Sequence, residues 1–171
     1  MNKSVAGAKF ATLLLVGLLT LSVNLKTSAA RREFVTPPYK ITAIKAMLFY
    51  EAKGTFSRDV LAKPDFTFWN TIIGEGDAES PSNSTLVLVE VTGKPSPDEL
   101  PLRKVELTAT ESRKVLLKRA TDIGSFGDAG KFYAGFWLYD TGCQPIKISA
   151  RITGQTQPSS MTKTIPFACG E

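Results

Sequence analysis

Short runs of alternating apolar and polar residues, separated by turn-forming residues, constrain the fold of this chain more than any other feature. In residues 146–152 the apolar Ile, Ile, Ala and Ile alternate with Lys, Ser and Arg, and residues 104–109 alternate in the same way. A period of two residues places one set of side chains on a buried face of a β-strand and the other set in solvent. Long stretches with helical spacing are lacking, so the pattern predicts strands.

Six further segments are predicted as strands because they are rich in Val, Ile, Thr and aromatic residues. They comprise residues 41–51, 66–73, 85–92, 114–120, 131–139 and 161–168. Residues 86–89 (Leu-Val-Leu-Val) are apolar on both faces, which is typical of a central strand. The five-residue loop 140–144 is expected to join two strands as a hairpin, with Gly142 at a positive φ. The spacing favours an all-β fold, an antiparallel β-sandwich of about 7–9 strands.

One segment, residues 128–134, resembles a motif of immunoglobulin domains. Its sequence Asp-Ala-Gly-Lys-Phe-Tyr-Ala is similar to the D-x-G-x-Y-x-C run that leads into a late strand of those domains. Phe132 stands where the corner tyrosine of the motif belongs, and Ala134 stands where its cysteine belongs. The resemblance implies an immunoglobulin-like sandwich and implies no function, because that fold carries many unrelated functions.

The N-terminal segment has the three zones of a cleavable signal peptide. Lys3 and Lys9 give a basic start, residues 10–23 are mostly apolar, and the small residues Ser-Ala-Ala occupy positions 28–30. The apolar run is shorter than the roughly 20 residues of a membrane-spanning helix. We therefore expect signal cleavage, with an uncleaved membrane anchor as the alternative.

Cleavage defines the expected parts of the chain: a signal peptide at 1–30, an extended leader at 31–40 and a single domain at 41–171. The mature protein is expected to be secreted or periplasmic and to have no membrane span. Removing three lysines from the 21 basic residues leaves 18 against 16 acidic residues, a net charge of +2. So small a charge argues against a nucleic-acid-binding protein, which usually carries a concentrated basic patch.

Cys143 and Cys169 are the two cysteines of the chain, and an even number in an exported protein favours a disulfide. Loop-closure entropy gives such a bond a value of roughly 3–3.5 kcal/mol. The bond is expected to attach the C-terminal strand to the rest of the domain. Free thiols for metal or redox chemistry are the alternative, but the chain has no histidine and no CxxC sequence.

The absence of histidine removes several classes of enzyme from consideration. Neither a Ser-His-Asp nor a Cys-His arrangement can be built, nor can a His-ligated zinc or iron centre. Glycine loops of the phosphate-binding and dinucleotide-binding types are missing as well. A hydrolase that uses two carboxylates stays open as an alternative, with Glu75, Asp77 and Glu106 as candidate acids. We expect a protein that is not an enzyme and has no cofactor.

Acidic residues in two predicted loops raise the alternative of calcium binding. Glu75 and Asp77 lie in one loop and Asp128 lies in another. Calcium takes six to eight oxygen ligands, so these carboxylates would need backbone carbonyls or a neighbouring loop to complete a site. Solvated turn residues are the competing interpretation, because Asp is common in turns for conformational reasons.

Aromatic residues on one predicted strand are the main candidate for a binding surface. Within residues 131–139, one face carries Phe132, Ala134, Phe136 and Leu138, and the other carries Tyr133, Gly135, Trp137 and Tyr139. If the first face fills the core, the second presents two tyrosines and a tryptophan outward, and Trp69 is expected to extend that surface. In the competing interpretation both faces are covered, one by the opposite sheet and the other by a loop or the leader.

These observations predict an exported, non-enzymatic binding module that uses an aromatic surface to hold an extracytoplasmic protein or a glycan. The candidate ligand-binding residues are Tyr133, Trp137, Tyr139 and Trp69, the candidate metal ligands are Glu75, Asp77 and Asp128, and the expected disulfide is Cys143–Cys169. A calcium-dependent binding module and a carboxylate-based hydrolase are the alternatives.

Overall fold

The computed structural model describes residues 38–94 and 103–170, all of which belong to the compact unit Val35–Glu171. The expected signal peptide at 1–30 lies outside the described residues, as does the expected leader up to residue 37. Among the residues described, no helix combines the length and the apolar character that crossing a membrane requires.

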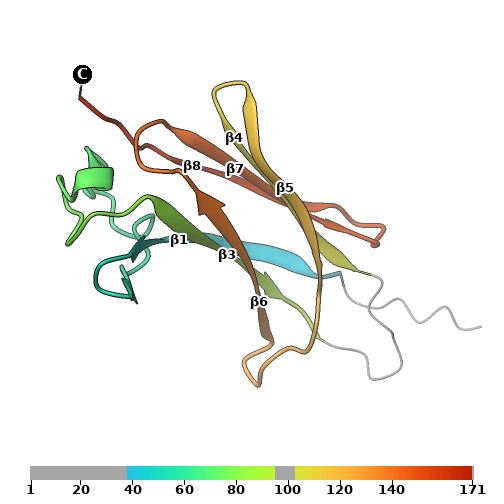
Figure 1. The fold of residues 1–171 in the computed structure, drawn as a ribbon. Coiled ribbons are helices and arrows are strands. Elements are labelled where there is room, and N and C mark those ends of the chain that lie inside the picture. The colour runs from blue at the N-terminus through green and yellow to red at the C-terminus, as the bar shows by residue number, and fades with distance from the viewer. Residues whose placement is uncertain (1–37, 95–102, 171) are drawn as a thin grey trace, which may run out of the picture. The chain divides into compact units, whose positions relative to one another are not determined.

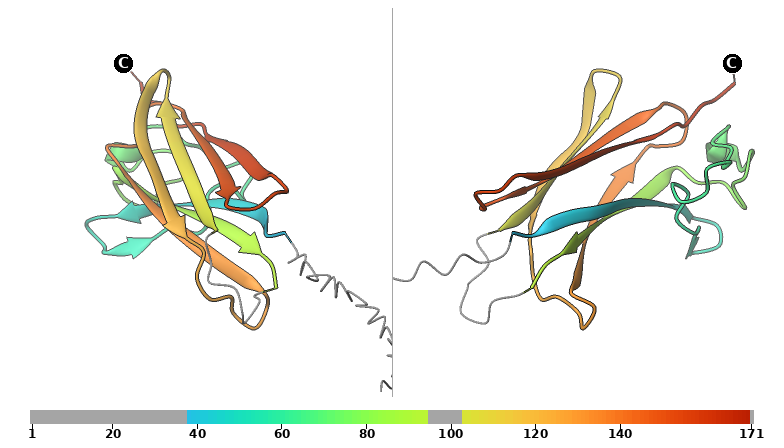
Figure 2. Two further views of the ribbon diagram at one scale, coloured as in Figure 1. Left: turned by 90° about the vertical axis from the view of Figure 1, so that its right-hand side faces the viewer. Right: turned by 180° about the vertical axis from the view of Figure 1, so that it is seen from behind.

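Eight antiparallel strands in the described part of the chain form two four-stranded sheets (Figure 1). The first sheet has the order β2-β1-β3-β6 and the second has the order β5-β4-β7-β8. Their bounds are β1 Lys40–Tyr50, β2 Thr55–Phe56, β3 Ser84–Thr92, β4 Lys104–Glu111, β5 Lys114–Asp122, β6 Lys131–Tyr139, β7 Ile146–Thr153 and β8 Ser159–Ile165. Seen from two other sides, β1 and β3 lie in one layer and β4, β5, β7 and β8 lie in the other (Figure 2). The predicted all-β, sandwich-like architecture with antiparallel strands is confirmed.

Alternation along the strands explains why the two sheets enclose a core. In β7, Ile146, Ile148, Ala150 and Ile152 are buried while the intervening residues are wholly or partly exposed, as their sequence predicts. β3 lies between β1 and β6, so the run of apolar residues on both of its faces marks a central strand as expected. The predicted bounds of β6 are also confirmed, and those of the other predicted strands are shifted by a few residues, with one exception.

The exception is residues 66–73, which were predicted as a strand and are not one. Thr71–Ile73 forms a short 3-10 helix, and the flanking Asn70 and Gly74 both have a positive φ, which ends an extended conformation. Trp69 makes an isolated parallel bridge to Ala168 instead of joining a sheet. The aromatic residues that suggested a strand pack against the end of the core, where the rings of Phe68 and Phe167 lie 5.6 Å apart.

The predicted hairpin at residues 140–144 is also wrong. Gly142 does have a positive φ, of 118°, but β6 belongs to the first sheet and β7 to the second, so this loop crosses between sheets. Its Thr141 is buried and its hydroxyl forms a 2.8 Å hydrogen bond with the Thr85 hydroxyl of β3. That buried contact draws the chain over the edge of the core, where a hairpin turn would leave Thr141 in solvent.

The predicted disulfide between Cys143 and Cys169 is present, with a Cα–Cα distance of 4.7 Å. It joins the β6–β7 crossover to the segment that follows β8. The same segment is held by two backbone hydrogen bonds, from Ala168 N–H to the Phe68 carbonyl at 3.0 Å and from Asn70 N–H to the Ala168 carbonyl at 2.8 Å. The disulfide therefore attaches the C-terminal part of the described chain to one end of the sandwich.

Replacing both cysteines, as Cys143→Ala with Cys169→Ala, should lower the free energy of unfolding by about 3.5 kcal/mol, because the bond closes a loop with a sequence separation of 26. Equilibrium denaturation in urea measures the change, with the oxidised wild type as reference. The circular dichroism of the variant at low denaturant should match that of the wild type, since both sheets keep their ladders. An unchanged midpoint would contradict the structural role of the bond.

Candidate functional site

Five aromatic residues lie together on the outer face of the first sheet, and we call Phe49, Phe56, Tyr133, Trp137 and Tyr139 the aromatic face. Four of them are substantially exposed: Phe56 by 43%, Tyr133 by 43%, Trp137 by 38% and Tyr139 by 67%. The alternation predicted for β6 is confirmed, because Ala134, Phe136 and Leu138 are buried in the core. The structure therefore leaves this surface open in the described part of the chain.

Ring contacts connect four members of the aromatic face. The Trp137 ring centroid lies 5.6 Å from that of Phe49, edge to face, and 5.6 Å from that of Phe56. The rings of Phe49 and Phe56 lie 5.1 Å apart, and the Tyr139 ring is nearly parallel to that of Trp137 at 6.2 Å. Such contacts stabilise aromatic pairs beyond simple burial and fix the positions of the rings. The surface is thus an ordered cluster contributed by three strands.

Strand register explains how residues from β2, β1 and β6 meet on one face. Phe49 is paired with Phe56 across β1 and β2, and Met47, Leu86 and Trp137 form one row across β1, β3 and β6. The next row contains Leu88 and Gly135, and because Gly135 has no side chain the two leucines of β3 are left partly exposed beside it. An apolar surface therefore extends between the aromatic rings.

A buried carboxylate borders the aromatic face along β3. Glu90 is only 6% exposed, and its Oε1 and Oε2 receive hydrogen bonds from the Thr42 hydroxyl at 3.0 Å and the Tyr133 hydroxyl at 2.8 Å. Lys131 Nζ lies 3.0 Å from Oε1 and Lys45 Nζ lies 3.2 Å from Oε2. Every oxygen of this carboxylate therefore has a charged and a neutral partner, which offsets the cost of removing it from water.

These partners hold Glu90 in its ionised form. The hydrogen bond from Lys131, aided by those from Tyr133, Thr42 and Lys45, outweighs burial and lowers the pKa of Glu90 from 4.5 to about 2. In return, the hydrogen bond to Glu90 raises the pKa of Lys45 above its usual value. Lys45 Nζ also lies 5.1 Å from the centroid of the Tyr133 ring, so the charge cluster fixes one end of the aromatic face.

The outer face of the second sheet has a different character. Its strands present Thr, Ser, Lys, Arg and Glu side chains, and Glu106 Oε2 accepts a 2.7 Å hydrogen bond from Arg151 Nε. Val115 of β5 is the one large apolar side chain among the described strands of this sheet that is substantially exposed, and it carries no aromatic ring. The aromatic face is thus restricted to one sheet.

Trp69, also predicted as a ligand-binding residue, lies apart from the aromatic face. It is 45% exposed, but it belongs to the connection between β2 and β3 and is bridged to Ala168. A Cβ placed at Gly170 would meet its ring at 2.9 Å, so this ring packs on the chain that follows the disulfide. The structure therefore brings Tyr133, Trp137 and Tyr139 together and separates Trp69 from them.

The candidate metal ligands do not converge. Glu75 accepts a hydrogen bond from the Asn70 side chain, and Asp77 Oδ2 accepts one from the Thr67 backbone N–H at 2.7 Å. This loop lies beside Tyr50 at the end of β1, because the Tyr50 hydroxyl accepts a hydrogen bond from Glu79 N–H. Asp128 instead lines a hollow beside Lys40.

The two loops lie at opposite ends of β1, whose bounds are Lys40–Tyr50. At about 3.3 Å per residue, a strand of that length separates them by roughly 33 Å. Within residues 38–94 and 103–170, no group of three acidic or sulfur-bearing side chains is placed to hold a metal ion. Glu75, Asp77 and Asp128 therefore cannot form one calcium site, since the loops that carry them are far apart.

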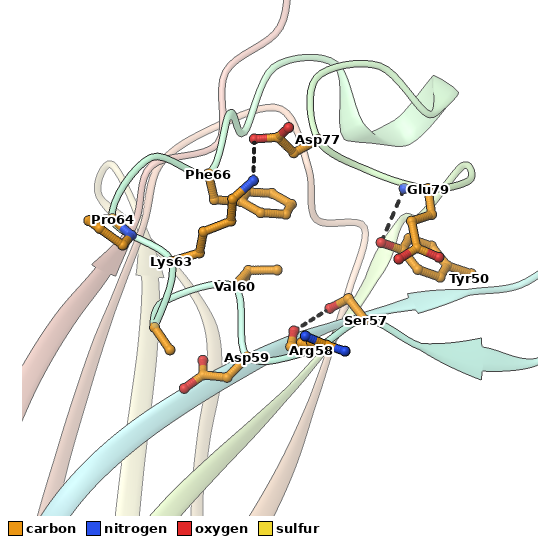
Figure 3. A pocket seen from close by; sticks show the side chains of 11 residues that line it. Tyr50, Ser57, Arg58, Asp59, Val60, Lys63, Pro64, Phe66, Asp77 and Glu79 are labelled. Atoms are coloured by element: carbon orange, nitrogen blue, oxygen red, sulfur yellow. Dashed lines mark hydrogen bonds and ion pairs between the residues drawn. The ribbon is translucent and has the colours of Figure 1, made fainter.

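A pocket of about 570 Å³ lies between the 57–66 segment and residues 77–79 (Figure 3). Two of its acidic groups have partners within the protein: Lys63 Nζ is 3.3 Å from Asp77 Oδ2, and Asp59 Oδ1 accepts hydrogen bonds from the backbone N–H groups of Ala46 and Leu61. The Thr67 backbone N–H, with Lys63, lowers the pKa of Asp77. The acids of this pocket thus serve to hold the loop in place.

Phe49 and Phe56 are functional candidates that the sequence analysis missed. Phe49 lies in the predicted strand 41–51, where alternation with the buried Leu48 and Tyr50 places it on the outer face. Phe56 lies in a strand of two residues, which is too short for periodicity to detect. The alternation of buried and exposed residues in 41–51 is enough to place Phe49 on the outer face. Phe56 could be found only from the pairing of β1 with β2.

Comparison of the chain with protein-family models, with curated protein sequences and with solved structures finds no match.

Glu90→Gln should remove much of the acid sensitivity of the fold. The pKa of Glu90 is about 2 in the folded protein, below its ordinary 4.5, so the stability it contributes is complete above pH 4.5 and is lost as the pH falls toward 2. In the wild type this group should account for roughly 2–3 kcal/mol of lost unfolding free energy across that interval. Denaturation at a series of pH values should show a shallower decline for the variant.

The matched control is Glu106→Gln on the second sheet, whose carboxylate is partly exposed and is paired with Arg151. Surface pairs contribute little, so this change should cost less than about 1 kcal/mol of unfolding free energy. Identical pH profiles for Glu90→Gln and the wild type would refute the role given to Glu90.

Proposed function

We propose that this protein is an exported, non-enzymatic binding module whose aromatic face holds a polypeptide partner outside the cytoplasm. The observation that carries the proposal is the restriction of large exposed rings to one of the two outer faces, where Phe56, Trp137 and Tyr139 form an ordered cluster. Contiguous apolar patches bordered by polar groups mark interaction sites in proteins. The disulfide Cys143–Cys169 suits an oxidising compartment.

A polypeptide fits this surface better than a glycan. The rings of Phe49 and Trp137 meet edge to face, so they form an uneven apolar surface and leave few broad ring faces on which a sugar can stack. The polar groups that border it at Tyr133, those around Glu90, are already bonded to one another and are not free to bind sugar hydroxyls. Tyr and Trp side chains are also the residues that contribute most to binding between proteins.

An immunoglobulin-like strand order is part of the proposal. In such sandwiches strands A, B and E share one sheet while C, F and G share the other. Equating β1, β3 and β6 with A, B and E, and β4, β7 and β8 with C, F and G, reproduces the pairing, with β5 beside C like the added strand of variable domains. The support comes from this order alone, since residues 128–134 then precede strand E, whereas the motif they resemble precedes strand F.

The two alternatives have less support. A calcium-dependent module lacks a converging ligand set, because Glu75 and Asp77 lie far from Asp128. A carboxylate-based hydrolase needs one acid whose pKa is raised so that it can donate a proton. Asp77, the candidate acid that lines the pocket, has a lowered pKa and is bonded to Lys63 and Thr67.

Trp137→Ala should abolish binding at the aromatic face while the protein stays folded, because the side chain is outside the core. Trp69→Ala is the matched control, since it removes a tryptophan of similar exposure from a different surface. Proteins retained from a native extract by the immobilised wild type and by Trp69→Ala should be lost by Trp137→Ala, and thermal melts of the three proteins should agree. Retention of the same partners by Trp137→Ala, or unfolding of that variant, would sink the proposal.

A further inference from the structure

The free edge of β6 is the least protected strand edge in the part of the chain that the structure describes. β6 is the last strand of its sheet, and its segment from Phe132 to Tyr139 contains no charged residue and no proline. Exposed, long and apolar edges pair readily with further strands, and proteins therefore usually block them. An unprotected edge beside the aromatic face is therefore a candidate site for pairing with a further strand.

The opposite edge of the same sheet is blocked. β2 has only two residues, and beyond it residues 57–60 cover the edge of β1. The backbone N–H of Ser57 donates to the Leu48 carbonyl at 2.9 Å, and that of Val60 donates to the Ala46 carbonyl at 2.8 Å. This segment uses the backbone groups with which another chain would otherwise pair.

Both edges of the second sheet carry charged residues or prolines that discourage pairing. These are Lys114, Lys118 and Arg119 on β5, and Lys163 with the flanking Pro158 and Pro166 on β8. Lysines and prolines at edges are the usual means by which proteins prevent strand addition. Of the four edge strands in the described residues, β6 alone has no such residue after its first position, Lys131, and no segment covers its edge beyond the Gly127 bond to the Lys131 carbonyl.

The backbone groups of the exposed residues of β6 point toward the free edge. The Gly130 carbonyl accepts a 3.2 Å hydrogen bond from Gly93, on the side of β3, whereas the Lys131 carbonyl accepts one from Gly127 at 3.0 Å. Because successive residues of a strand direct their backbone groups to opposite sides, the free-edge set also includes Tyr133, Gly135, Trp137 and Tyr139. The residues with open backbone groups are thus those with exposed side chains.

We infer that a second copy of this chain pairs with β6, antiparallel, about a two-fold axis at Gly135. This inference rests on the proposed function and names the polypeptide partner at the same surface. β6 is bounded by positive φ values at Gly130 (66°) and Asp140 (55°), which are equidistant from Gly135. Pairing the two strands about their centres therefore places Gly135 opposite Gly135 and uses the open backbone groups from Tyr133 to Trp137, while the Lys131 carbonyl keeps its bond to Gly127. Two-fold symmetry is the commonest arrangement of identical subunits.

Side chains and charges in this register are complementary. Trp137 lies opposite Tyr133 of the second copy, which makes an aromatic cross-strand pair at each side of the axis. Lys131 lies opposite Tyr139 of the second copy and next to its Asp140, so each end of the paired strands brings a cation beside an anion. The two aromatic faces become one surface on a continuous eight-stranded sheet.

The proposed correspondence with immunoglobulin strands indicates where an added strand would lie. In constant-type immunoglobulin domains, strand D pairs with strand E at the edge of the A-B-E sheet. With β6 equated with E, the second copy's β6 occupies the position of D, which none of the described strands fills.

Gly135→Pro tests the backbone pairing. It removes an N–H that points to the free edge and so should spare the β3–β6 ladder. Gly135→Ala is the matched control, because its Cβ meets Leu88 at 3.5 Å and Leu86 at 3.7 Å, ordinary contacts, and its N–H stays. Light scattering of the full chain over a concentration series should show a dimer for the wild type and for Gly135→Ala. For Gly135→Pro the dissociation constant of the dimer should rise at least about tenfold, which shifts the protein toward monomer.

A charge exchange at the axis tests the register without proline. Gly135→Lys and Gly135→Glu should each be monomeric, since like charges face each other, while an equimolar mixture of the two should form dimers. A wild type that stays monomeric, or a mixture that does not dimerise, overturns the inference. If Trp137→Ala then still loses a different retained protein, the proposed function survives and the second copy is the wrong partner; if it loses nothing, both fail.

Discussion

The register of the β3–β6 ladder determines which side chains of β6 enter the core and which form the aromatic face. Side chains alternate with a period of two, so a shift of one residue would bury Trp137 and expose Phe136. The hydrogen bond between the Thr85 and Thr141 hydroxyls, at the end of this ladder, joins β3 to the crossover and is fully buried. A slip would leave these hydroxyls without partners in an apolar core, which opposes it at a cost of the order of 1–3 kcal/mol per group.

The local sequence pattern was sufficient to predict most of the strands and to predict which side chains of each strand face the core. Alternation in β6 and β7 separates core from surface residues, and the paired cysteines indicated the disulfide. It was insufficient where the outcome depends on distant contacts. Which sheet a strand joins is one such case, because the 140–144 loop has the composition of a hairpin turn and yet crosses between sheets.

The aromatic run at residues 66–69 shows the same limit. Its apolar side chains cover the end of the core near Phe167. Burying apolar side chains there does not require a strand, and the composition of the segment is the same whether it forms a strand or an irregular covering loop. Phe56 is the complementary case. Its place in the candidate site follows from pairing with Phe49, and no periodic signal can arise from two residues.

The position of the disulfide has a mechanical consequence. Cys169 follows β8 and is bonded covalently to Cys143, which precedes β7, so both strands lie inside the closed loop. Tension applied to the polypeptide beyond Cys169 would pass through the sulfur bridge directly to the crossover after β6. β7 and β8 would carry none of that load, and beyond the crossover the resistance to stretching would come from the β3–β6 ladder.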